Sequence, residues 1–180
     1  APEHDEFAVA SPSPQTPLEG VRVIDASNLV AGPLSTNLLA DFGADVIKIE
    51  HPENGDALRN LSPHKDDVSL WWKMTARNKR CITLDLSDST GNEIFKELVS
   101  DADIVVENFR PGTMEEWGIG YETLKEVNSD IIVLRVTGYG QTGPYKNQPG
   151  FGRMATAMGG VSHITGDPEG PPLTPGYPLG

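Results

Sequence analysis

The sequence of 180 residues contains very little cysteine, and Cys81 is the only one. A single cysteine cannot form a disulfide within the chain, and no set of metal-ligating side chains surrounds it in the sequence. This cysteine usage is typical of a protein from a reducing compartment. We therefore expect Cys81 to be a small, buried side chain.

Long apolar runs are also absent from the sequence. No stretch approaches the roughly 20 apolar residues that a helix needs to cross a bilayer. The opening residues, 1–17, are acidic and rich in proline, unlike a secretory or transit peptide. The sequence therefore predicts a cytoplasmic protein without a membrane partner.

Positive charge is scarce. Lysine and arginine number 14 against 26 aspartates and glutamates, so the net charge is -12. A surface of this sign repels nucleic acid and anionic membranes, which argues against either as a general partner. Any anionic ligand must then be held locally, while the acidic residues, spread along the chain, are interpreted as a solubilising surface.

Motifs for metal or hydrolytic chemistry are missing as well. The sequence contains no Gly-x-Ser-x-Gly elbow and no Gly-x-x-x-x-Gly-Lys phosphate loop. The histidines have no His, Cys or acidic neighbours at metal-ligand spacing; they are His4, His51, His64 and His163. No metal is predicted.

What the sequence does contain is an alternation of short β-branched runs with segments of helical spacing. Strands are expected at 21–25, 45–50, 81–86, 103–108 and 131–137. Helices are expected at 34–42, 69–76, 113–117, 121–127 and 151–158, with a further one capped by Ser87 or Asp88 and reaching Val99. This alternation predicts an α/β fold, a Rossmann-like parallel sheet with flanking helices. Residues 1–17 are expected to form a flexible N-terminal arm.

A Gly-x-Gly-x-x-Gly pattern follows the last predicted strand, at residues 138–143. In a dinucleotide-binding protein this pattern opens a helix and precedes a second strand that ends in an acid. Here Pro144 and Pro149 interrupt any such helix. Binding of NAD or a flavin is therefore not expected.

Three turns carry groups suited to an anionic ligand. Residues 28–33 offer small side chains and the free amides of a helix start, although a plain tight turn explains them equally well. Lys79 and Arg80 offer two cations, or an ordinary stretch of surface. Residues 107–112 combine a polar pair, an aromatic ring and a guanidinium that can stack on adenine and hold phosphate, or simply form a capped loop.

Six motifs follow one another in a fixed order. They are PLEGVRVIDASNLVAGP, LLADFGADVIKIEHPENGD, ARNKRCITLDL, VENFRPG followed by GIGYETL, VTGYGQTGPY, and GDPEGPPLTPGYPLG. Together they resemble the family III CoA-transferases, the CaiB/BaiF group that includes formyl-CoA transferase. The resemblance runs without a break from about Pro17 to Gly180 and, rather than the spacing arguments, carries the functional prediction.

The resemblance implies a CoA-binding, Rossmann-like domain over 18–180, an incomplete N-terminal part of the large domain of an interlocked homodimer. It implies an acyl-CoA:carboxylate CoA-transferase that moves CoA between two small organic acids, with dicarboxylates favoured. Coenzyme A or acyl-CoA is then a substrate, and no resident metal, NAD or flavin is implied.

The family's nucleophile is an aspartate that ends the pattern Pro-Gly-x-x-x-Gly-Asp and passes through an anhydride and a thioester. Residues 175–180 match this pattern up to its last position. The resemblance therefore places the nucleophile immediately after Gly180 and no catalytic residue within the chain. Without the missing C-terminal portion, this chain is expected to be inactive.

By position, the resemblance implies contacts with CoA after the strands and in two later segments. These residues are Val30, Ala31, His51, Leu84, Asp85, Leu86, Ser87, Asn108, Phe109, Arg110, Trp117, Gly150, Phe151 and Gly152. His51 stands where some relatives have arginine. Lys79 and Arg80 are the residues that would compensate for it.

Two alternative functions remain open at this point. A 2-methylacyl-CoA racemase-like enzyme shares the fold but needs a histidine where Phe151 stands, which favours CoA transfer. A non-catalytic acyl-CoA-binding module is the second alternative. Many relatives also have an acid where Gly152 stands, so the subgroup, and with it the acceptor acid, is not identified by the motifs.

Overall fold

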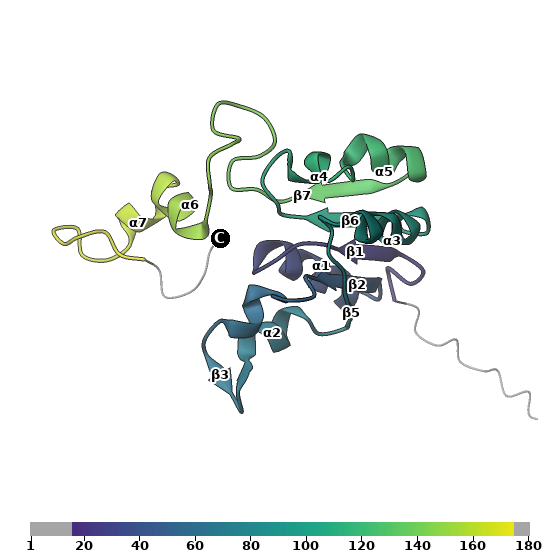
Figure 1. The fold of residues 1–180 in the computed structure, drawn as a ribbon. Coiled ribbons are helices and arrows are strands. Elements are labelled where there is room, and N and C mark those ends of the chain that lie inside the picture. The colour runs from purple at the N-terminus through teal and green to yellow at the C-terminus, as the bar shows by residue number, and fades with distance from the viewer. Residues whose placement is uncertain (1–15, 175–180) are drawn as a thin grey trace, which may run out of the picture.

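The computed structural model describes residues 16–174 (Figure 1). The arm expected over 1–17 lies outside the described residues except for Thr16 and Pro17, and the 175–180 pattern lies outside them entirely. In the described range, no helix combines the length and the apolar character needed to cross a membrane.

A parallel sheet of five strands, in the order β5-β2-β1-β6-β7, forms the centre of the molecule. Its strands are β1 (Arg22–Asp25), β2 (Asp45–Glu50), β5 (Lys79–Thr83), β6 (Ile104–Glu107) and β7 (Ile132–Arg135). The chain begins at the centre, moves outward to β5, and then returns to the other side of β1. The strand order therefore reverses between β1 and β6. In α/β proteins, ligands bind in the crevice at the carboxyl ends of two such strands.

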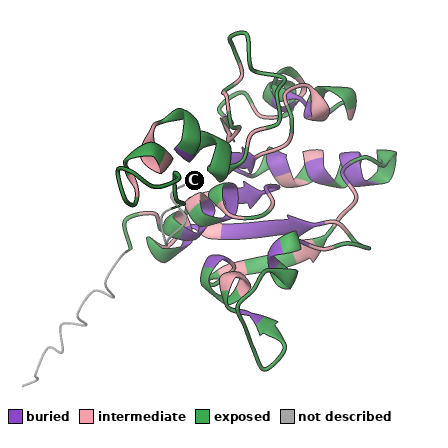
Figure 2. Cartoon of the chain, turned by 90° about the vertical axis from the view of Figure 1, so that its left-hand side faces the viewer, coloured by how far each residue is buried: buried purple, intermediate pink, exposed green. Residues whose placement is uncertain are grey.

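Helices cover both faces of the sheet. On one face, Val23 and Val46 pack with Ala40 of α1 (Ala31–Asp41). On the other, Ile24 and Val105 belong to a larger core with side chains from α3 (Ser89–Ser100), α4 (Thr113–Glu116) and α5 (Tyr121–Val127). Successive strand side chains point to opposite faces, which gives the two cores and the buried strands of Figure 2. The α/β prediction is confirmed.

The predicted helix ends are largely confirmed. Pro33 lies in the first turn of α1, and Asp88 caps α3 by accepting hydrogen bonds from the amides of Thr90 and Gly91. Ser69 caps α2 (Leu70–Thr75), where its hydroxyl accepts from the amide of Trp72. These caps satisfy amides that have no partner within the first helical turn.

Strand β5 differs from its prediction in bounds and in burial. It begins at Lys79 and ends at Thr83, because its neighbour β2 ends at Glu50 and offers no further ladder. The strand lies at the edge of the sheet, and Cys81 is exposed. The expectation of a buried Cys81 is therefore wrong.

Three short elements after β2 were not predicted. The 3-10 helix η1 (Ala57–Asn60) precedes an antiparallel hairpin of β3 (His64–Lys65) and β4 (Val68–Ser69). Asp66 and Asp67 form the hairpin turn with φ angles of 50° and 59°. Two-residue hairpins adopt such turns readily, but strands this short leave no hydrophobic period in the sequence.

The glycine-rich segment after β7 forms a closed loop without a helix. A Cβ on Gly138 would lie 2.5 Å from the Cα of Gly150, so the two ends of the loop cross at a distance that only glycine permits. The 138–143 pattern therefore does not open a helix, as expected. Beyond this loop, α6 (Gly152–Met158) and α7 (Val161–Ile164) stand away from the sheet (Figure 1).

Candidate functional site

Most of the predicted ligand-binding residues come together at the carboxyl edge of the sheet. Val30 follows β1, His51 follows β2, Leu84 follows β5 and Asn108 follows β6. In a parallel sheet the carboxyl ends of all strands meet at one edge, so segments distant in sequence become neighbours here. This edge faces the side on which α6 and α7 lie (Figure 1).

Two loops are tied together across the crevice between β1 and β6. The side-chain oxygen of Asn108 accepts a hydrogen bond from the amide of Asn28 at 2.8 Å, and its nitrogen donates to the carbonyl of Asn28 at 2.7 Å. The side chain of the predicted contact residue Asn108 thus binds the backbone of the opposite loop. These two bonds hold the loop after β1 against the loop after β6.

The start of α1 presents free backbone amides at this crevice. The N–H groups of Val30, Ala31 and Gly32 donate no hydrogen bond to a described residue. Such amides, aligned with the helix dipole, attract an anion or a polarised oxygen. A Cβ on Gly32 would lie 2.3 Å from the Oγ of Ser27, so only glycine lets the helix start this close to β1.

An aromatic pair and an arginine follow β6. The rings of Phe109 and Trp117 meet edge to face, with centroids 5.0 Å apart, and both are partly buried. The adjacent Arg110 is exposed and makes no ion pair with a described residue. This segment combines a π surface with an available guanidinium, as an adenine and a phosphate require.

The outer side of the edge is polar. The Nε2 of His51 lies 3.7 Å from the Oδ2 of Asp85, and both side chains are partly exposed. The Ser87 hydroxyl and the Ser87 amide both donate to Asp85, and these bonds lower the pKa of its carboxyl group. An ionised Asp85 next to His51 makes this part of the edge a polar rim rather than a phosphate site.

Buried charged side chains beneath residues 26–32 hold the loop between β1 and α1 in place. Asp25, fully buried at the end of β1, accepts from the hydroxyl of Thr36 at 2.7 Å and from the ammonium of Lys79 at 2.9 Å. Burial alone would raise the pKa of Asp25, but Lys48, Lys79 and Ser27 together lower it below its ordinary value. Asp25 is therefore ionised and anchors the start of the loop through Ser27.

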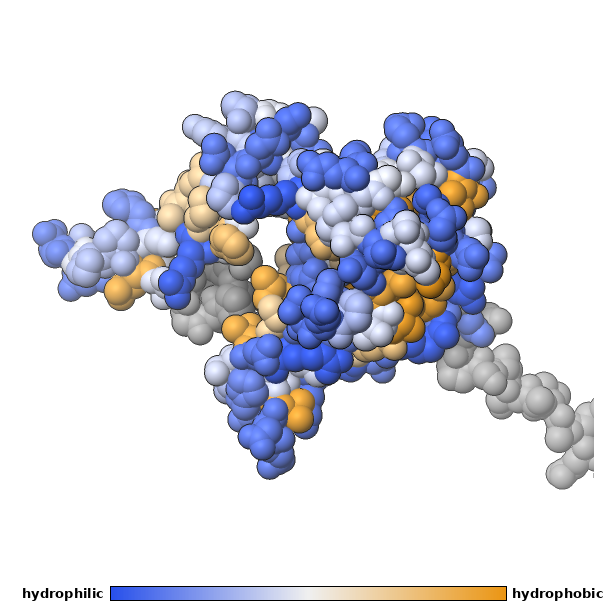
Figure 3. Space-filling view, in the orientation of Figure 1, coloured by the Kyte–Doolittle hydropathy of each residue, from blue (hydrophilic) through white to orange (hydrophobic). Residues whose placement is uncertain are grey.

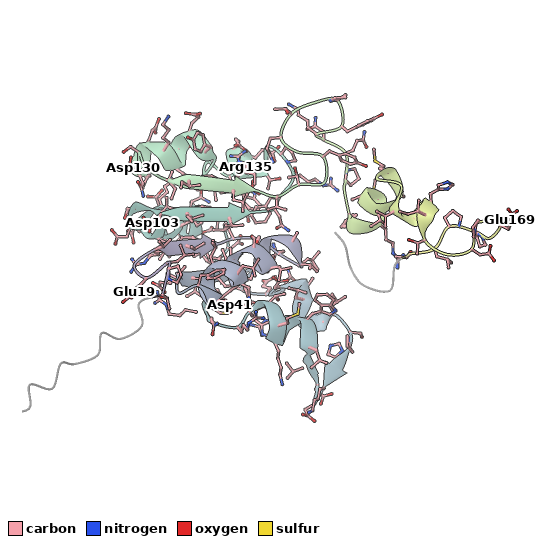
Figure 4. The ribbon with its side chains drawn as sticks, turned by 180° about the vertical axis from the view of Figure 1, so that it is seen from behind. Glu19, Asp41, Asp103, Asp130, Arg135 and Glu169 are labelled. Atoms are coloured by element: carbon pink, nitrogen blue, oxygen red, sulfur yellow. The ribbon has the colours of Figure 1, made fainter. Side chains whose placement is uncertain are left out.

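Glu107 is a second buried acid, at the end of β6. Its Oε2 accepts from the amide of Phe109 at 2.7 Å, and Arg135 of β7 lies 3.6 Å from its Oε1. Burial raises the pKa of Glu107, only partly opposed by Phe109 and Arg135. Figure 4 shows Arg135 toward the carboxyl end of β7, with Asp103 and Asp130 at the opposite end of the sheet.

The last predicted segment joins the glycine-rich loop to α6. Gly150 closes the glycine loop, and Phe151, 67% exposed, precedes α6, which begins at Gly152. The space-filling view shows an opening between the body of the molecule and the segment that carries α6 and α7 (Figure 3). Phe151 contributes no packing to either hydrophobic core.

Comparison with known proteins decides the family. The sequence model described as CoA-transferase family III matches residues 18–180. The chain belongs to CoA-transferase family III. It is 52% identical to the succinyl-CoA–L-malate CoA-transferase beta subunit of Chloroflexus aurantiacus over 89% of this chain and 40% of that protein. It is 43% identical to the mouse succinyl-CoA:glutarate CoA-transferase over 91% of this chain and 38% of that protein.

Solved structures place this family III chain in the same fold. A CaiB/BaiF family protein from Brucella suis superposes with a TM-score of 0.85 at 38% identity, over 91% of this chain and 44% of that one. A hypothetical protein from Mycobacterium tuberculosis gives 0.84 at 37% identity, over 93% and 46%. The chain thus spans less than half the length of the relatives it matches.

Lys79 and Arg80 lie apart from the other predicted contacts of this family III chain. Both are at the start of β5, beside Val46 and Ile47 at the beginning of β2, and so at the amino edge of the sheet. The ammonium of Lys79 is buried against Asp25, and Arg80 pairs with Asp45 at 2.6 Å. Arg80 therefore stays at the amino edge, because strand direction places its side chain beside Asp45. The ammonium of Lys79 reaches Asp25 at the carboxyl end of β1, but it is buried there and is not available to a ligand.

Sequence reasoning missed three charged residues that shape the site of this family III chain: Asp25, Lys48 and Asp56. All three are at most 1% exposed. A weak signal exists for Lys48, which interrupts the apolar strand DVIKIE, since a lysine among buried strand residues needs a partner. Its partner, Asp56, cannot be identified from spacing. No cluster of metal-ligating side chains occurs among residues 16–174.

Proposed function

We propose that CoA binds across the carboxyl edge of the sheet, at the crevice between β1 and β6. The observation that supports this most directly is the set of unpartnered amides of Val30, Ala31 and Gly32 at the crevice. Backbone donors of this kind bind phosphate or carbonyl oxygens without requiring a positive surface. They suit an anionic cofactor on a chain of net charge -12.

The ends of CoA have natural places along this edge. The rings of Phe109 and Trp117 offer a surface for adenine, and the guanidinium of Arg110 offers charge for a phosphate. Residues 84–87 and His51 form the polar rim. Gly150, Phe151 and Gly152, which join the glycine-rich loop to α6, complete the proposed set of contacts. Neither Lys79 nor Arg80 contacts CoA in this proposal, because the Lys79 ammonium is buried against Asp25 and Arg80 lies at the opposite edge.

The reaction we propose is CoA transfer between two carboxylic acids, catalysed by the full-length protein. An aspartate directly after Gly180 attacks the thioester carbonyl and releases CoA thiolate, leaving a mixed anhydride. The thiolate attacks the aspartyl carbonyl and releases the donor acid. The acceptor acid and then the thiolate repeat these steps in reverse, so acyl activation is conserved without ATP. Backbone amides stabilise the oxyanions, and the site must exclude water.

A dicarboxylate pair fits this proposal best. The relatives named above are a succinyl-CoA–L-malate and a succinyl-CoA:glutarate CoA-transferase, and a 48% identical relative is a succinyl-CoA–D-citramalate CoA-transferase. By analogy, succinyl-CoA is the first donor to test, with L-malate, D-citramalate and glutarate as acceptors. The working form we propose is an intertwined homodimer of longer chains in the cytoplasm.

The first test is to trap the aspartyl thioester. Full-length protein incubated with succinyl-CoA should carry a CoA adduct on the peptide that includes the residue after Gly180, detected by mass spectrometry. Adding a competent acceptor acid should remove the adduct and produce the new acyl-CoA. Replacement of that aspartate by asparagine should abolish both. An adduct elsewhere, or acyl-CoA conversion without any second acid, would contradict CoA transfer.

The position of CoA is tested by two arginines that are both exposed. Arg110→Met should weaken CoA binding about tenfold, since a charge-assisted hydrogen bond is lost at the carboxyl edge. Arg80→Met removes a similar charge at the amino edge and should leave the CoA dissociation constant unchanged. Isothermal titration calorimetry measures both. The reverse order of effects would place the ligand at the other edge of the sheet.

A further inference from the structure

Two fully buried charged side chains lie beneath the loop that follows β1. Lys48 of β2 is 1% exposed, and Asp56, which directly precedes η1, is 0% exposed. The Nζ of Lys48 lies 3.0 Å from the Oδ2 of Asp56. Neither side chain reaches the surface, so neither can contact a ligand directly.

We propose that this Lys48–Asp56 pair is the positioning device of the CoA-binding loop, since it sets the turn at Leu29 that presents the free amides of residues 30–32. The pair acts through the loop and is not catalytic. This inference rests on the proposed function, because it assigns a use to amides that we assign to CoA.

The turn at Leu29 requires external support. Leu29 has a φ of 62°, in the left-handed region that side chains other than glycine, asparagine and aspartate rarely occupy. Its amide donates to the Oδ1 of Asp56 at 3.0 Å. Without this acceptor, Leu29 is free to relax to a negative φ, which would reorient the peptide that carries the amide of Val30.

The hydrogen bonds of the loop divide it into a held part and a free part. The amides of Ser27, Asn28 and Leu29 donate to the side chains of Asp25, Asn108 and Asp56, respectively. Lys48 adds a hydrogen bond to the carbonyl of Ser27. The amides of the next three residues find no acceptor among the described residues. The bound amides therefore fix the direction of the free ones.

A purely structural role for Asp56 is the competing explanation. The same Oδ1 also accepts from the amide of Leu58 at 2.9 Å and so caps η1, while the amide of Asp56 donates to Glu50 at 3.1 Å. Loss of Asp56 would therefore loosen η1 as well as the loop. A decisive experiment must separate these two consequences.

The first comparison uses two full-length variants without the buried charge pair. Lys48→Met/Asp56→Asn keeps an amide oxygen for Leu29, whereas Lys48→Met/Asp56→Leu has the same shape and no acceptor. Removing both charges together avoids an unpaired buried ion. We expect CoA to bind about tenfold more weakly to the second variant than to the first, since the left-handed turn loses its support. Amide hydrogen exchange of residues 27–32 should be faster in the second variant.

A glycine rescue distinguishes positioning from stability. Adding Leu29→Gly to Lys48→Met/Asp56→Leu should restore most of the CoA affinity, because glycine adopts a φ near 62° without strain. Asn78→Gly is the matched control, since Asn78 also has a left-handed φ, of 61°, but lies before β5 at the amino edge. It should not restore binding. A defect confined to η1 would respond to neither glycine.

The outcomes separate this inference from the proposed function. Wild-type protein that binds no CoA would overturn the proposed function and this inference with it. Wild-type protein that binds CoA, combined with equal affinities of the two double variants or with no rescue by Leu29→Gly, would overturn the inference alone. Thermal unfolding verifies that each variant is folded, and Lys48→Met/Asp56→Ala replaces the leucine variant if the latter does not fold.

Discussion

At the residue scale, the buried acid Glu107 at the end of β6 makes the stability of the folded protein depend on pH. Its carboxyl group is almost fully buried, with Arg135 at 3.6 Å, too far for a short hydrogen bond. Ionisation of Glu107 therefore costs desolvation that its neighbours recover only in part, and its pKa is raised.

We expect Glu107→Gln to change how stability depends on pH. A raised pKa means that the folded state binds more protons than the unfolded state, so the free energy of unfolding falls as pH rises through the range above the ordinary glutamate pKa. Glutamine keeps the acceptor for Phe109 but cannot ionise, so this fall should become smaller. Thermal unfolding from about pH 4 to pH 7 measures it.

Glu115→Gln is the control for this experiment. Glu115 also contacts Arg135, at 2.6 Å, but its side chain is 46% exposed. Its replacement should leave the fall in stability with rising pH in place. An unchanged pH dependence in Glu107→Gln would mean that Glu107 is already ionised at little cost in the folded protein.

At the element scale, the β3–β4 hairpin is an element that an analysis of hydrophobic periodicity cannot detect. Its strands contain two residues each, and three of these four residues are exposed. The turn residues Asp66 and Asp67 have positive φ angles, which aspartate tolerates better than most residues but less well than asparagine or glycine. The pair of aspartates was the only local signal for the turn.

Asp66→Asn/Asp67→Gly should stabilise the protein. The replacements suit a two-residue hairpin turn and remove two adjacent negative charges, with an expected gain of about 0.5 to 1 kcal/mol in the free energy of unfolding. Asp66→Ala/Asp67→Ala removes the same charges without suiting the turn and should destabilise. Urea denaturation compares the two variants. Equal gains from both would attribute the effect to charge rather than to backbone geometry.

At the scale of the whole molecule, the excess of acidic residues acts against folding. The net charge of -12 is spread over the surface, and blue, hydrophilic groups cover much of the face shown in Figure 3. Self-repulsion of this kind destabilises the compact state and is screened by salt. Its long range makes it a property of the molecule rather than of one element.

We expect the midpoint of thermal unfolding to rise between about 0.1 M and 1 M sodium chloride, as the Debye length falls from about 10 Å to about 3 Å. The rise should disappear near the isoelectric point, which is about pH 4.6 for this chain. A midpoint that falls with salt at neutral pH would mean that surface ion pairs, such as Arg80 with Asp45, outweigh the repulsion.

The amino-acid sequence by itself determined the order of the five sheet strands and their main helices, the helix cap near Asp88, and the resemblance to its family. These features depend on residues that are close in sequence, so the hydrophobic periods and the capping residues can be recognised from the sequence alone. The sequence also placed Val30, His51 and Asn108 correctly at strand ends, which the parallel sheet then gathered at one edge.

Only the tertiary structure decided which charged residues face the site. Arg80 is found at the amino edge, the Lys79 ammonium is buried against Asp25, and Cys81 is exposed because β5 borders the sheet. The hydrogen bond from the Leu29 amide to Asp56 joins residues 27 positions apart, and Lys48 pairs with the same Asp56 from the neighbouring strand. Such contacts depend on strand direction and on burial, because a charge in the interior must find its partner in space, and no local pattern records that partner.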